Sequence, residues 1–171
     1  MKPVFWSRLD LAARRFTPFG LTILLVLINA LPLQVPGLVR VMPLLPLMSI
    51  YLWVVHHPNL MPMYAVFLVG ILQDVLSGVP LGVYGLTYLI VYATVIWQRR
   101  FLAGKSFAVI WVGFTLVAAG AGAVGWVLVS AYHAVLIEPG AIAFQYLMSL
   151  GVFPLLAWVF MRWQRAFLSQ V

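Results

Sequence analysis

The stretch GILQDVLSGVPLG, residues 70–82, decides how the middle of this chain folds. It lies inside the apolar block 60–97, which as one helix would be about 57 Å long, roughly twice the hydrocarbon thickness of a bilayer. The block must therefore fold back on itself. Its turn-like sequence is Ser77-Gly78-Val79-Pro80, because Gly accepts positive φ and Pro lacks a backbone donor. We predict two antiparallel helices joined at this turn.

Composition indicates a membrane setting for these helices. Of the 171 residues, 65% are hydrophobic and 8% are charged, and the mean hydropathy is +1.09. A soluble domain cannot bury that much apolar surface, so we predict an all-α polytopic membrane protein. A span needs about 20 apolar residues, so the charge-free stretches leave room for five or six helices, and we predict six transmembrane helices. Their expected ranges are 16–33, 38–55, 60–77, 81–97, 107–132 and 141–161.

The expected domain organisation is simple. Residues 16–161 are predicted to form a single six-helix membrane domain. The basic segment 1–15 is expected in the cytoplasm, where apolar residues at helical spacing predict a short interfacial helix. We interpret the first apolar run as an uncleaved span, because Ile28-Asn29-Ala30 is a poor signal-peptide cleavage site. The remaining residues, 162–171, are expected to form a cytoplasmic tail.

The basic residues predict the orientation of the helices. With a cytoplasmic N-terminus, inside segments hold four, three and two of the ten Lys and Arg residues, and only Arg40 lies outside. This bias is the one that the positive-inside rule describes, and six spans then place both the N- and C-termini in the cytoplasm. The net charge of +7 therefore needs no nucleic acid to explain it. We expect membrane lipid, and no nucleic acid, among the partners.

Asp74 is the only acidic residue between positions 11 and 137, and it lies one turn before the predicted bend. A charge inside a bilayer costs about 2.5–3.5 kcal/mol on insertion scales, so such side chains usually face protein or water. Three roles stay open: a structural hydrogen bond or helix-end cap, a contact with a partner helix, and a proton or substrate relay. A relay would need a second group, and no other carboxylate lies in a predicted span. The structural or partner-interface candidates are Gly70, Asp74, Ser77, Gly78, Pro80 and Gly82.

Small residues recur at four-residue spacing in the fifth predicted span, where residues 118–125 read AAGAGAVG. Small side chains let helix backbones approach closely in membranes, so this face predicts helix packing. The packing partner is left open between the same chain, a second copy in a homo-oligomer, and another protein. The helix-packing candidates are Ala118, Ala121, Gly122 and Gly125.

Catalytic patterns are lacking in this sequence. There is no cysteine, which excludes disulfides and thiolate chemistry. His56 and His57 are adjacent and have no Cys, Asp or Glu close by, so we expect two interfacial histidines and no metal site. No Ser-His-Asp pattern, P-loop or carboxylate pair is present. We therefore expect no enzyme activity and no cofactor.

The order of residues between positions 43 and 86 carries a family resemblance. Pro43-x-x-Pro46, Tyr51-Leu52-Trp53 and Pro58 are followed by Gly70-x-x-x-Asp74-x-x-Ser77-Gly78-x-x-Leu81-Gly82 and then Leu86. This pattern resembles that of the bacterial rod shape-determining protein MreD family, and the chain length and six expected spans are similar too. The resemblance implies structural or partner-interface roles for the positions that match the family pattern, which are Gly70, Asp74, Gly78 and Gly82.

This resemblance implies a non-catalytic scaffold that crosses the bacterial inner membrane several times. The family belongs to the elongasome, the machinery that inserts side-wall peptidoglycan and maintains cell shape. The implied direct partner is MreC, a single-span protein. MreB filaments, the glycosyltransferase RodA and its class B penicillin-binding transpeptidase are expected in the same complex.

A hypothesis of a different class is the substrate-binding membrane subunit of an energy-coupling-factor transporter, which is also a small six-span protein. Such subunits usually carry an Ala-x-x-x-Ala face in the first span, and TPFGLTILLVLINALPL, residues 17–33, lacks it. Deep polar residues are also few for a polar ligand, namely Asn29, Gln73, Asp74 and Gln145. The scaffold is therefore the favoured hypothesis, and a remnant ligand pocket stays open.

Overall fold

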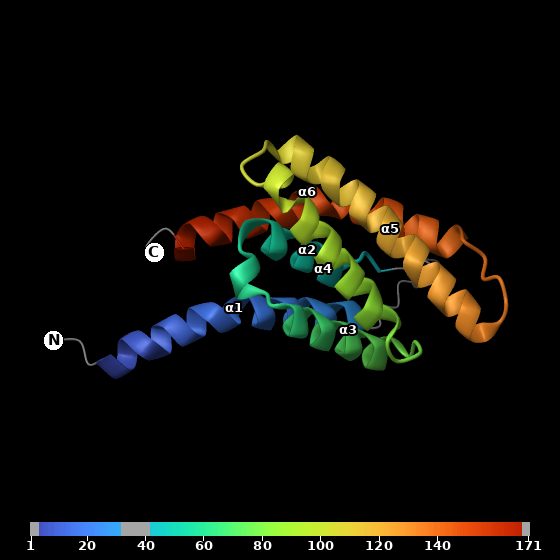
Figure 1. Cartoon of the computed structure of the whole chain (residues 1–171), viewed down its shortest axis with the longest axis horizontal. Helices are drawn as coiled ribbons and strands as arrows, with labels where there is room; N and C mark the ends of the chain where they lie inside the picture. The colour runs from blue at the N-terminus through green and yellow to red at the C-terminus, as the bar shows by residue number, and fades with distance from the viewer. Residues whose placement is uncertain (1–3, 32–41, 169–171) are drawn as a thin grey trace.

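The chain is all-helical in the part that the structure describes, as predicted. The computed structural model describes residues 4–31 and 42–168, with side chains described in 16–31 and 42–165. The elements are α1 (Val4–Ala30), α2 (Leu45–His56), the short 3₁₀ helix η1 (Pro58–Leu60), α3 (Met63–Ser77), α4 (Val83–Leu102), α5 (Phe107–His133) and α6 (Gly140–Leu168). Figure 1 shows the start of α1 and the end of α6 on the same side of the bundle.

The core of the bundle is α2, whose residues 46–55 are all buried. It contacts α1, α4, α5 and α6. The ring of Tyr51 packs edge-on against Phe114 of α5, with 5.4 Å between centroids, and Trp53 packs against Phe160 of α6 at 4.6 Å. With 12 residues, α2 is about 18 Å long, which is shorter than a hydrocarbon core of about 30 Å. Protein side chains therefore surround this helix in place of lipid.

The irregular backbone before α2 is held by side chains of two other helices. Backbone polar groups inside a membrane protein need partners from the protein, because lipid offers none. Asn29 of α1 donates to Pro43 O (2.7 Å), Gln145 of α6 donates to Met42 O (2.9 Å), and Ser149 Oγ of α6 accepts from Leu44 N (2.9 Å). These three bonds join α1 and α6 to the start of α2.

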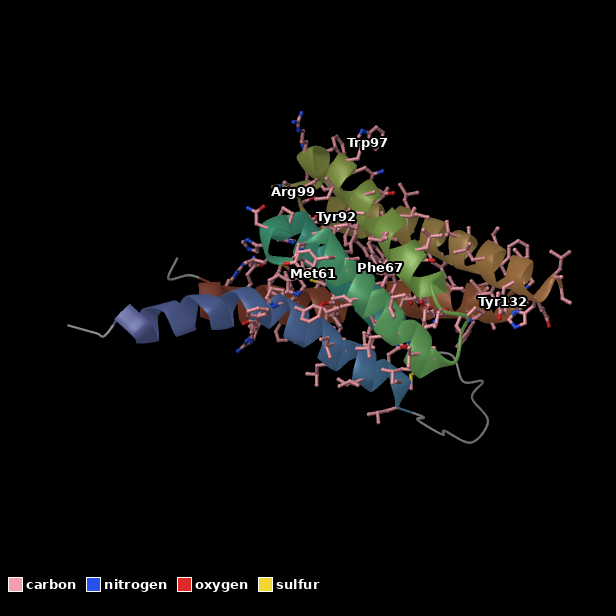
Figure 2. The ribbon with its side chains drawn as sticks, turned by 60° about the horizontal axis from the view of Figure 1, so that its bottom comes forward. Met61, Phe67, Tyr92, Trp97, Arg99 and Tyr132 are labelled. Carbon is pink, nitrogen blue, oxygen red and sulfur yellow. The ribbon has the colours of Figure 1, made fainter. Side chains whose placement is uncertain are left out.

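An apolar outer surface surrounds this core. Large hydrophobic side chains are exposed on α1, α3, α4, α5 and α6. Among the described residues, Phe107–His133 and Gly140–Arg165 are the helices long and apolar enough to cross a membrane. Trp97 is 82% exposed and Tyr132 is 70% exposed, and Figure 2 shows them at opposite ends of the bundle. Aromatic side chains at both ends are typical of membrane interfaces, so the surface indicates a membrane protein.

Several helices differ from their predicted ranges. The segment before the first predicted span is continuous with it in α1, which contains Pro18. Among the described residues the second helix begins at Leu45, after the non-helical residues 42–44, and Pro46 lies in its first turn, where a missing N–H is tolerated. Residues 32–41, which hold the first predicted turn, lie outside the described residues. Both α4 and α6 continue past their predicted ends, since leaving the hydrocarbon layer does not end a helix.

Candidate functional site

The predicted bend closes the last turn of α3 around Asp74. Gly78 has φ 66° and ψ 20°, a left-handed conformation that glycine adopts without a Cβ clash. The N–H groups of Gly78 and Val79 both donate to the main-chain oxygen of Asp74. The helix therefore ends directly after Ser77, as the turn chemistry predicted.

The carboxylate of Asp74 caps the next helix. Its Oδ1 accepts the N–H of Tyr84 at 2.8 Å, and its Oδ2 accepts those of Gly82 at 2.9 Å and Gly85 at 3.3 Å. The first N–H groups of a helix have no partner within it, and the helix dipole makes this end positive. Asp74 is 0% exposed, and these three bonds compensate for the water that its charge has lost.

Two facing glycines bring α3 close enough for this cap. A Cβ on Gly70 would lie 2.5 Å from Cα and 2.7 Å from N of Gly85, so only glycine fits there. A Cβ on Gly85 would lie 3.1 Å from Ile71 Cδ1 and 3.2 Å from Phe67 Cε2, which is tight but less severe. Because Gly70 and Asp74 are four residues apart on one face of α3, the close contact and the cap form one unit.

The connection between α3 and α4 directs a donor toward the carboxylate. Gly82 has φ 102° and ψ −12°, a conformation that residues with a Cβ rarely adopt. Its N–H is one of the three that bond Asp74, and the oxygen of Pro80 accepts the N–H of Val83 at 3.3 Å. The predicted positions within 70–82 are thus brought together as one helix–bend–helix junction.

Ser77 belongs to a second polar row beside this junction. Gln73 Nε2 donates to Ser77 Oγ at 2.9 Å and to Asn29 Oδ1 at 3.2 Å. Asn29 in turn donates to Pro43 O, so the row links α3 to α1 and to the start of α2. The Oε1 atom of Gln73 is buried and has no hydrogen-bond partner in the described structure.

The predicted packing face of α5 borders a cavity of about 220 Å³. The four candidates on its wall are Ala118, Ala121, Gly122 and Gly125. A Cβ on Gly122 would meet Ile142 Cγ2 at 3.6 Å, and a Cβ on Gly125 would meet no atom within 4 Å. Gly122 is therefore in ordinary van der Waals contact with α6, whereas Gly125 faces open space; Ala118 and Ala121 are buried in the core of the same chain. Packing against another chain stays a prediction.

The two adjacent histidines hold the end of α2. His56 Nδ1 is bonded to Leu52 O at 2.9 Å, and His57 Nε2 is bonded to the amide of Gln164 on α6. Burial, followed by the charges of His56 and Arg99, lowers the pKa of His57. A neutral ring can accept the Gln164 N–H, so the contact joins two helices. Among the described residues, no group of three or more His, Cys, Asp or Glu could hold a metal ion.

Sequence reasoning missed Gly85 and Tyr88. Gly85 is identified only by its contact with Gly70 across the bend, and nothing in its local spacing distinguishes it from a lipid-facing glycine. Tyr88 is 1% exposed and its hydroxyl is buried without a partner. The spacing of Tyr84 and Tyr88, one helical turn apart, is the signal that could have located this inward face.

Comparison with known proteins places the whole junction inside one family. A family model described as rod shape-determining protein MreD matches residues 13–169, nearly the whole chain. No curated protein and no solved structure matches it. The matched range contains the bend at 70–82, the cavity wall on α5 and the α2 core. The chain therefore belongs to the rod shape-determining protein MreD family.

Proposed function

We propose that this chain is a non-catalytic, multi-pass scaffold of the bacterial inner membrane that binds MreC in the elongasome. The observation that carries the proposal is the family match over residues 13–169, because the family acts in rod shape determination. In this proposal MreB filaments, RodA and its class B penicillin-binding transpeptidase act in the same complex. The chain supports side-wall peptidoglycan synthesis by holding partners and catalyses no step itself.

The proposed topology has six spans and both termini in the cytoplasm. It is supported by the way the C-terminal ends of α2, α4 and α6 meet. Trp53 of α2 packs against Phe160 of α6, and Arg99 Nε of α4 donates to Val55 O at the end of α2 (3.4 Å). The same end of the bundle carries Arg99, Arg100, Lys105, Arg162 and Arg165. The positive-inside rule assigns such an end to the cytoplasm.

The bonding of Asp74 supports a structural role over a relay. Both of its carboxylate oxygens are engaged by backbone N–H groups of α4. A relay between carboxylates would need a second one in reach, and the other carboxylate among the described side chains is Glu138, in the connection before α6. The described connections between helices are short, so partners would be recognised mainly through helix faces.

Depletion and complementation in a rod-shaped bacterium test the proposal. The host's own family member is depleted and this chain, carrying an affinity tag, is expressed in its place. We expect cells to become round on depletion, to regain rod shape with this chain, and to yield MreC when the chain is purified. An unrelated six-span membrane protein carrying the same affinity tag is the control for non-specific capture of MreC. Cells that keep their rod shape but lose uptake of a vitamin would support the transporter hypothesis instead.

A further inference from the structure

A groove on the outer surface of the bundle runs between α4 and α5. One hollow of about 430 Å³ lies beside the end of α4, and a second of about 150 Å³ lies beside the middle of both helices. Gln98 and Leu116 line both hollows, so the two form one continuous groove. Phe101 and Trp97 border it at the end of α4, where they are 69% and 82% exposed. Apolar surface of this kind needs lipid or a partner to cover it.

The groove has the length of one lipid molecule. On α5 it extends from Val109 to Val124, which is a rise of about 22 Å along the helix. A bilayer with its headgroups is about 40–45 Å thick, so one leaflet is about 20–22 Å deep. The transmembrane helix of a partner would cross the whole hydrocarbon core, about 30 Å, and would need a longer face. A lipid from one leaflet therefore fits the groove better than a helix does.

The polarity of the groove changes along its length as it does in a phospholipid. The inner half is mainly aliphatic, and the hydroxyl on its wall, that of Thr94, donates to Ile90 O at 2.8 Å. Nearer the end of α4, Gln98 and Trp97 bring an amide and an indole N–H to the wall. Side chains that combine an apolar body with a polar tip favour the interfacial layer, where lipid esters and water lie.

The outer end of the groove carries a positive charge with no carboxylate beside it. Lys105 Nζ lies 5.6 Å from the centroid of the Phe101 ring, which lines the groove. Of the described carboxylates, Asp74 caps the start of α4 and Glu138 follows the end of α5, so both belong to the other end of these helices. The N-terminus of α5 comes directly after this lysine, and its dipole adds to the positive potential. A headgroup of net negative charge complements this end.

We propose that the groove between α4 and α5 is a binding site for one anionic phospholipid from the leaflet at this end of the bundle, the cytoplasmic leaflet in the proposed topology. The headgroup phosphate pairs with Lys105, and one acyl chain lies along the groove as far as Gly120 and Val124. A zwitterionic lipid with an ammonium headgroup is disfavoured, because its ammonium group would lie close to the lysine. The site rests on the proposed membrane location but does not require MreC, so loss of lipid binding and loss of MreC binding are separate results.

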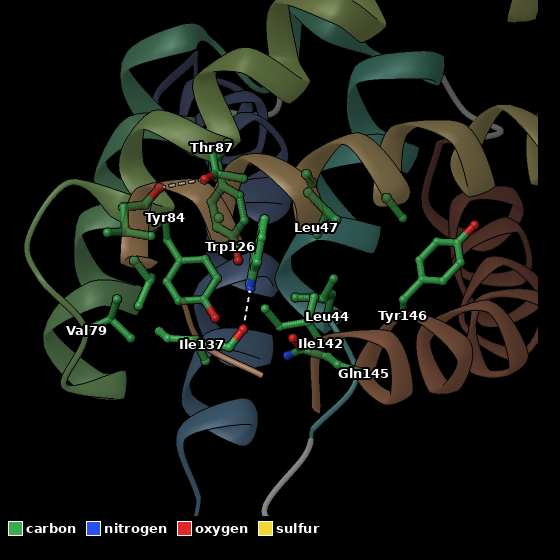
Figure 3. A pocket seen from close by; sticks show the side chains of 17 residues that line it. Leu44, Leu47, Val79, Tyr84, Thr87, Trp126, Ile137, Ile142, Gln145 and Tyr146 are labelled. Carbon is green, nitrogen blue, oxygen red and sulfur yellow. Dashed lines mark hydrogen bonds between the residues drawn. The ribbon is translucent and has the colours of Figure 1, made fainter. Parts of the chain in front are cut away.

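Another face of α5 offers a control position. Figure 3 shows the cavity on that face, where Trp126 Nε1 donates to Ile137 O at 2.8 Å. Gly125 lines this cavity and Gly120 lines the groove, and an added Cβ at either glycine would meet no atom within 4 Å. A leucine at each position therefore fills a different space without a backbone clash.

Competition between two lipids tests the headgroup preference. The full-length chain is delipidated in detergent, mixed with equal amounts of phosphatidylglycerol and phosphatidylethanolamine with identical acyl chains, and measured by native mass spectrometry. We expect one phosphatidylglycerol per chain to be retained in preference to phosphatidylethanolamine. Lys105→Gln should lower this preference about fivefold, the worth of one basic residue near a lipid surface.

The matched control for this charge is Arg162→Gln. Arg162 lies at the same end of the bundle, on α6, and its guanidinium group also lies over an exposed ring, 5.3 Å from the centroid of Trp158. It does not line the groove. This substitution should change the preference less than about twofold.

The glycine pair tests where the acyl chain lies. Gly120→Leu should lower the retained amount of both lipids about threefold, because the leucine displaces part of the chain from its contacts with the helices. Gly125→Leu should retain both lipids as the wild type does. If Gly120→Leu does not fold, the comparison of Lys105→Gln with Arg162→Gln decides alone, since both side chains are exposed.

Four outcomes would overturn the proposal. Equal retention of the two lipids by the wild type would mean that the headgroup is not recognised. Equal effects of Lys105→Gln and Arg162→Gln would mean that only the overall surface charge attracts lipid. Loss of lipid in Gly125→Leu alone would place the chain in the cavity of Figure 3. A dimer that retains no lipid would mean that a second copy of the chain covers the groove.

Discussion

Gly70 and Gly85 meet backbone to backbone across the bend, since a Cβ on Gly70 would stand 2.5 Å from the Cα of Gly85. One turn further along α3, the carboxylate of Asp74 bonds three N–H groups at the start of α4. The first contact sets the separation of the two helices, and the second sets where the following helix begins. The contribution of each contact to the free energy of unfolding can be tested separately.

Gly70→Ala should destabilise the fold because the added methyl group overlaps backbone, which cannot rotate away. Overpacking of this kind costs about 1–3 kcal/mol, and here we expect the upper part of that range. Reversible unfolding in mixed micelles measures the change. Gly20→Ala on the exposed side of α1 is the control, because an added Cβ there meets no atom within 4 Å. Equal stability of the two variants would contradict the close contact.

Asp74→Leu should be more damaging than Asp74→Asn. Leucine leaves three N–H groups at the start of α4 without an acceptor, at a cost of about 2–3 kcal/mol. Asparagine keeps one oxygen, but its NH₂ group faces a backbone donor where the second oxygen was, so we expect an intermediate loss. Unfolding in mixed micelles and co-purification of MreC are both measured. Loss of MreC from a stably folded Asp74→Leu variant would instead support a direct partner contact.

Gly82→Ala should be more destabilising than Gly78→Ala. Gly82 has φ 102°, outside the left-handed region open to other residues, whereas Gly78 has φ 66°, inside it. We expect losses of about 2–3 and about 1 kcal/mol respectively. Gly78→Asn should recover most of the stability lost in Gly78→Ala, because asparagine tolerates this conformation. The reverse order of the two alanine variants would contradict the assigned bend.

Tyr51 and Gly113 should be coupled. The Tyr51 hydroxyl donates to Ile110 O at 2.9 Å, and a Cβ on Gly113 would lie 2.6 Å from that hydroxyl oxygen. Tyr51→Phe should cost about 1 kcal/mol, and Gly113→Ala should cost more. The double variant should be about 1 kcal/mol more stable than the sum of the two single losses predicts, because the phenylalanine removes the nearer clashing atom; Leu102 Cδ2, at 2.9 Å from the added Cβ, remains. Additive losses would contradict the contact.

Stability should decrease in mild acid because of His57. Burial, then the charges of His56 and Arg99, lowers its pKa below the ordinary 6.5. The unfolded chain therefore takes up the proton more readily than the folded one. The stabilisation that neutral His57 gives the folded state is full above about pH 6.5 and is lost as the pH falls through the lowered pKa. We expect the apparent melting temperature to fall between about pH 7 and pH 5, and to fall less in His57→Gln. Parallel pH profiles would contradict this.

The position of the bend was predictable because the turn chemistry is local, and a cap was one of the three roles left open for Asp74. Gly78 and Pro80 identify the reversal, and a lone carboxylate one turn earlier suggests a cap. The donors themselves, on Gly82, Tyr84 and Gly85, could not be assigned, since they depend on how two helices cross. Pairing of Gly70 with Gly85 is a tertiary contact that leaves no pattern in either helix.

The buried position of α2 was not predictable from its residues. In a soluble protein, a helix that is apolar all round is recognised as core, but in a membrane the lipid-facing helices are equally apolar. The sequence therefore contains no contrast between α2 and α5. For the same reason, the small residues at 118–125 predicted close packing, although a small side chain borders a cavity as readily as it borders a helix.

The hydrogen bonds at the start of α2 have a consequence for the order of assembly. Met42 and Leu44 are bonded by Gln145 and Ser149, 103 and 105 residues later in the chain. While the ribosome is still making α3 to α5, the main-chain groups before the central helix have no such partners. Completion of the fold therefore waits for the last helix to be synthesised and inserted, and a nascent chain that stops before α6 is expected to be a substrate for membrane proteases.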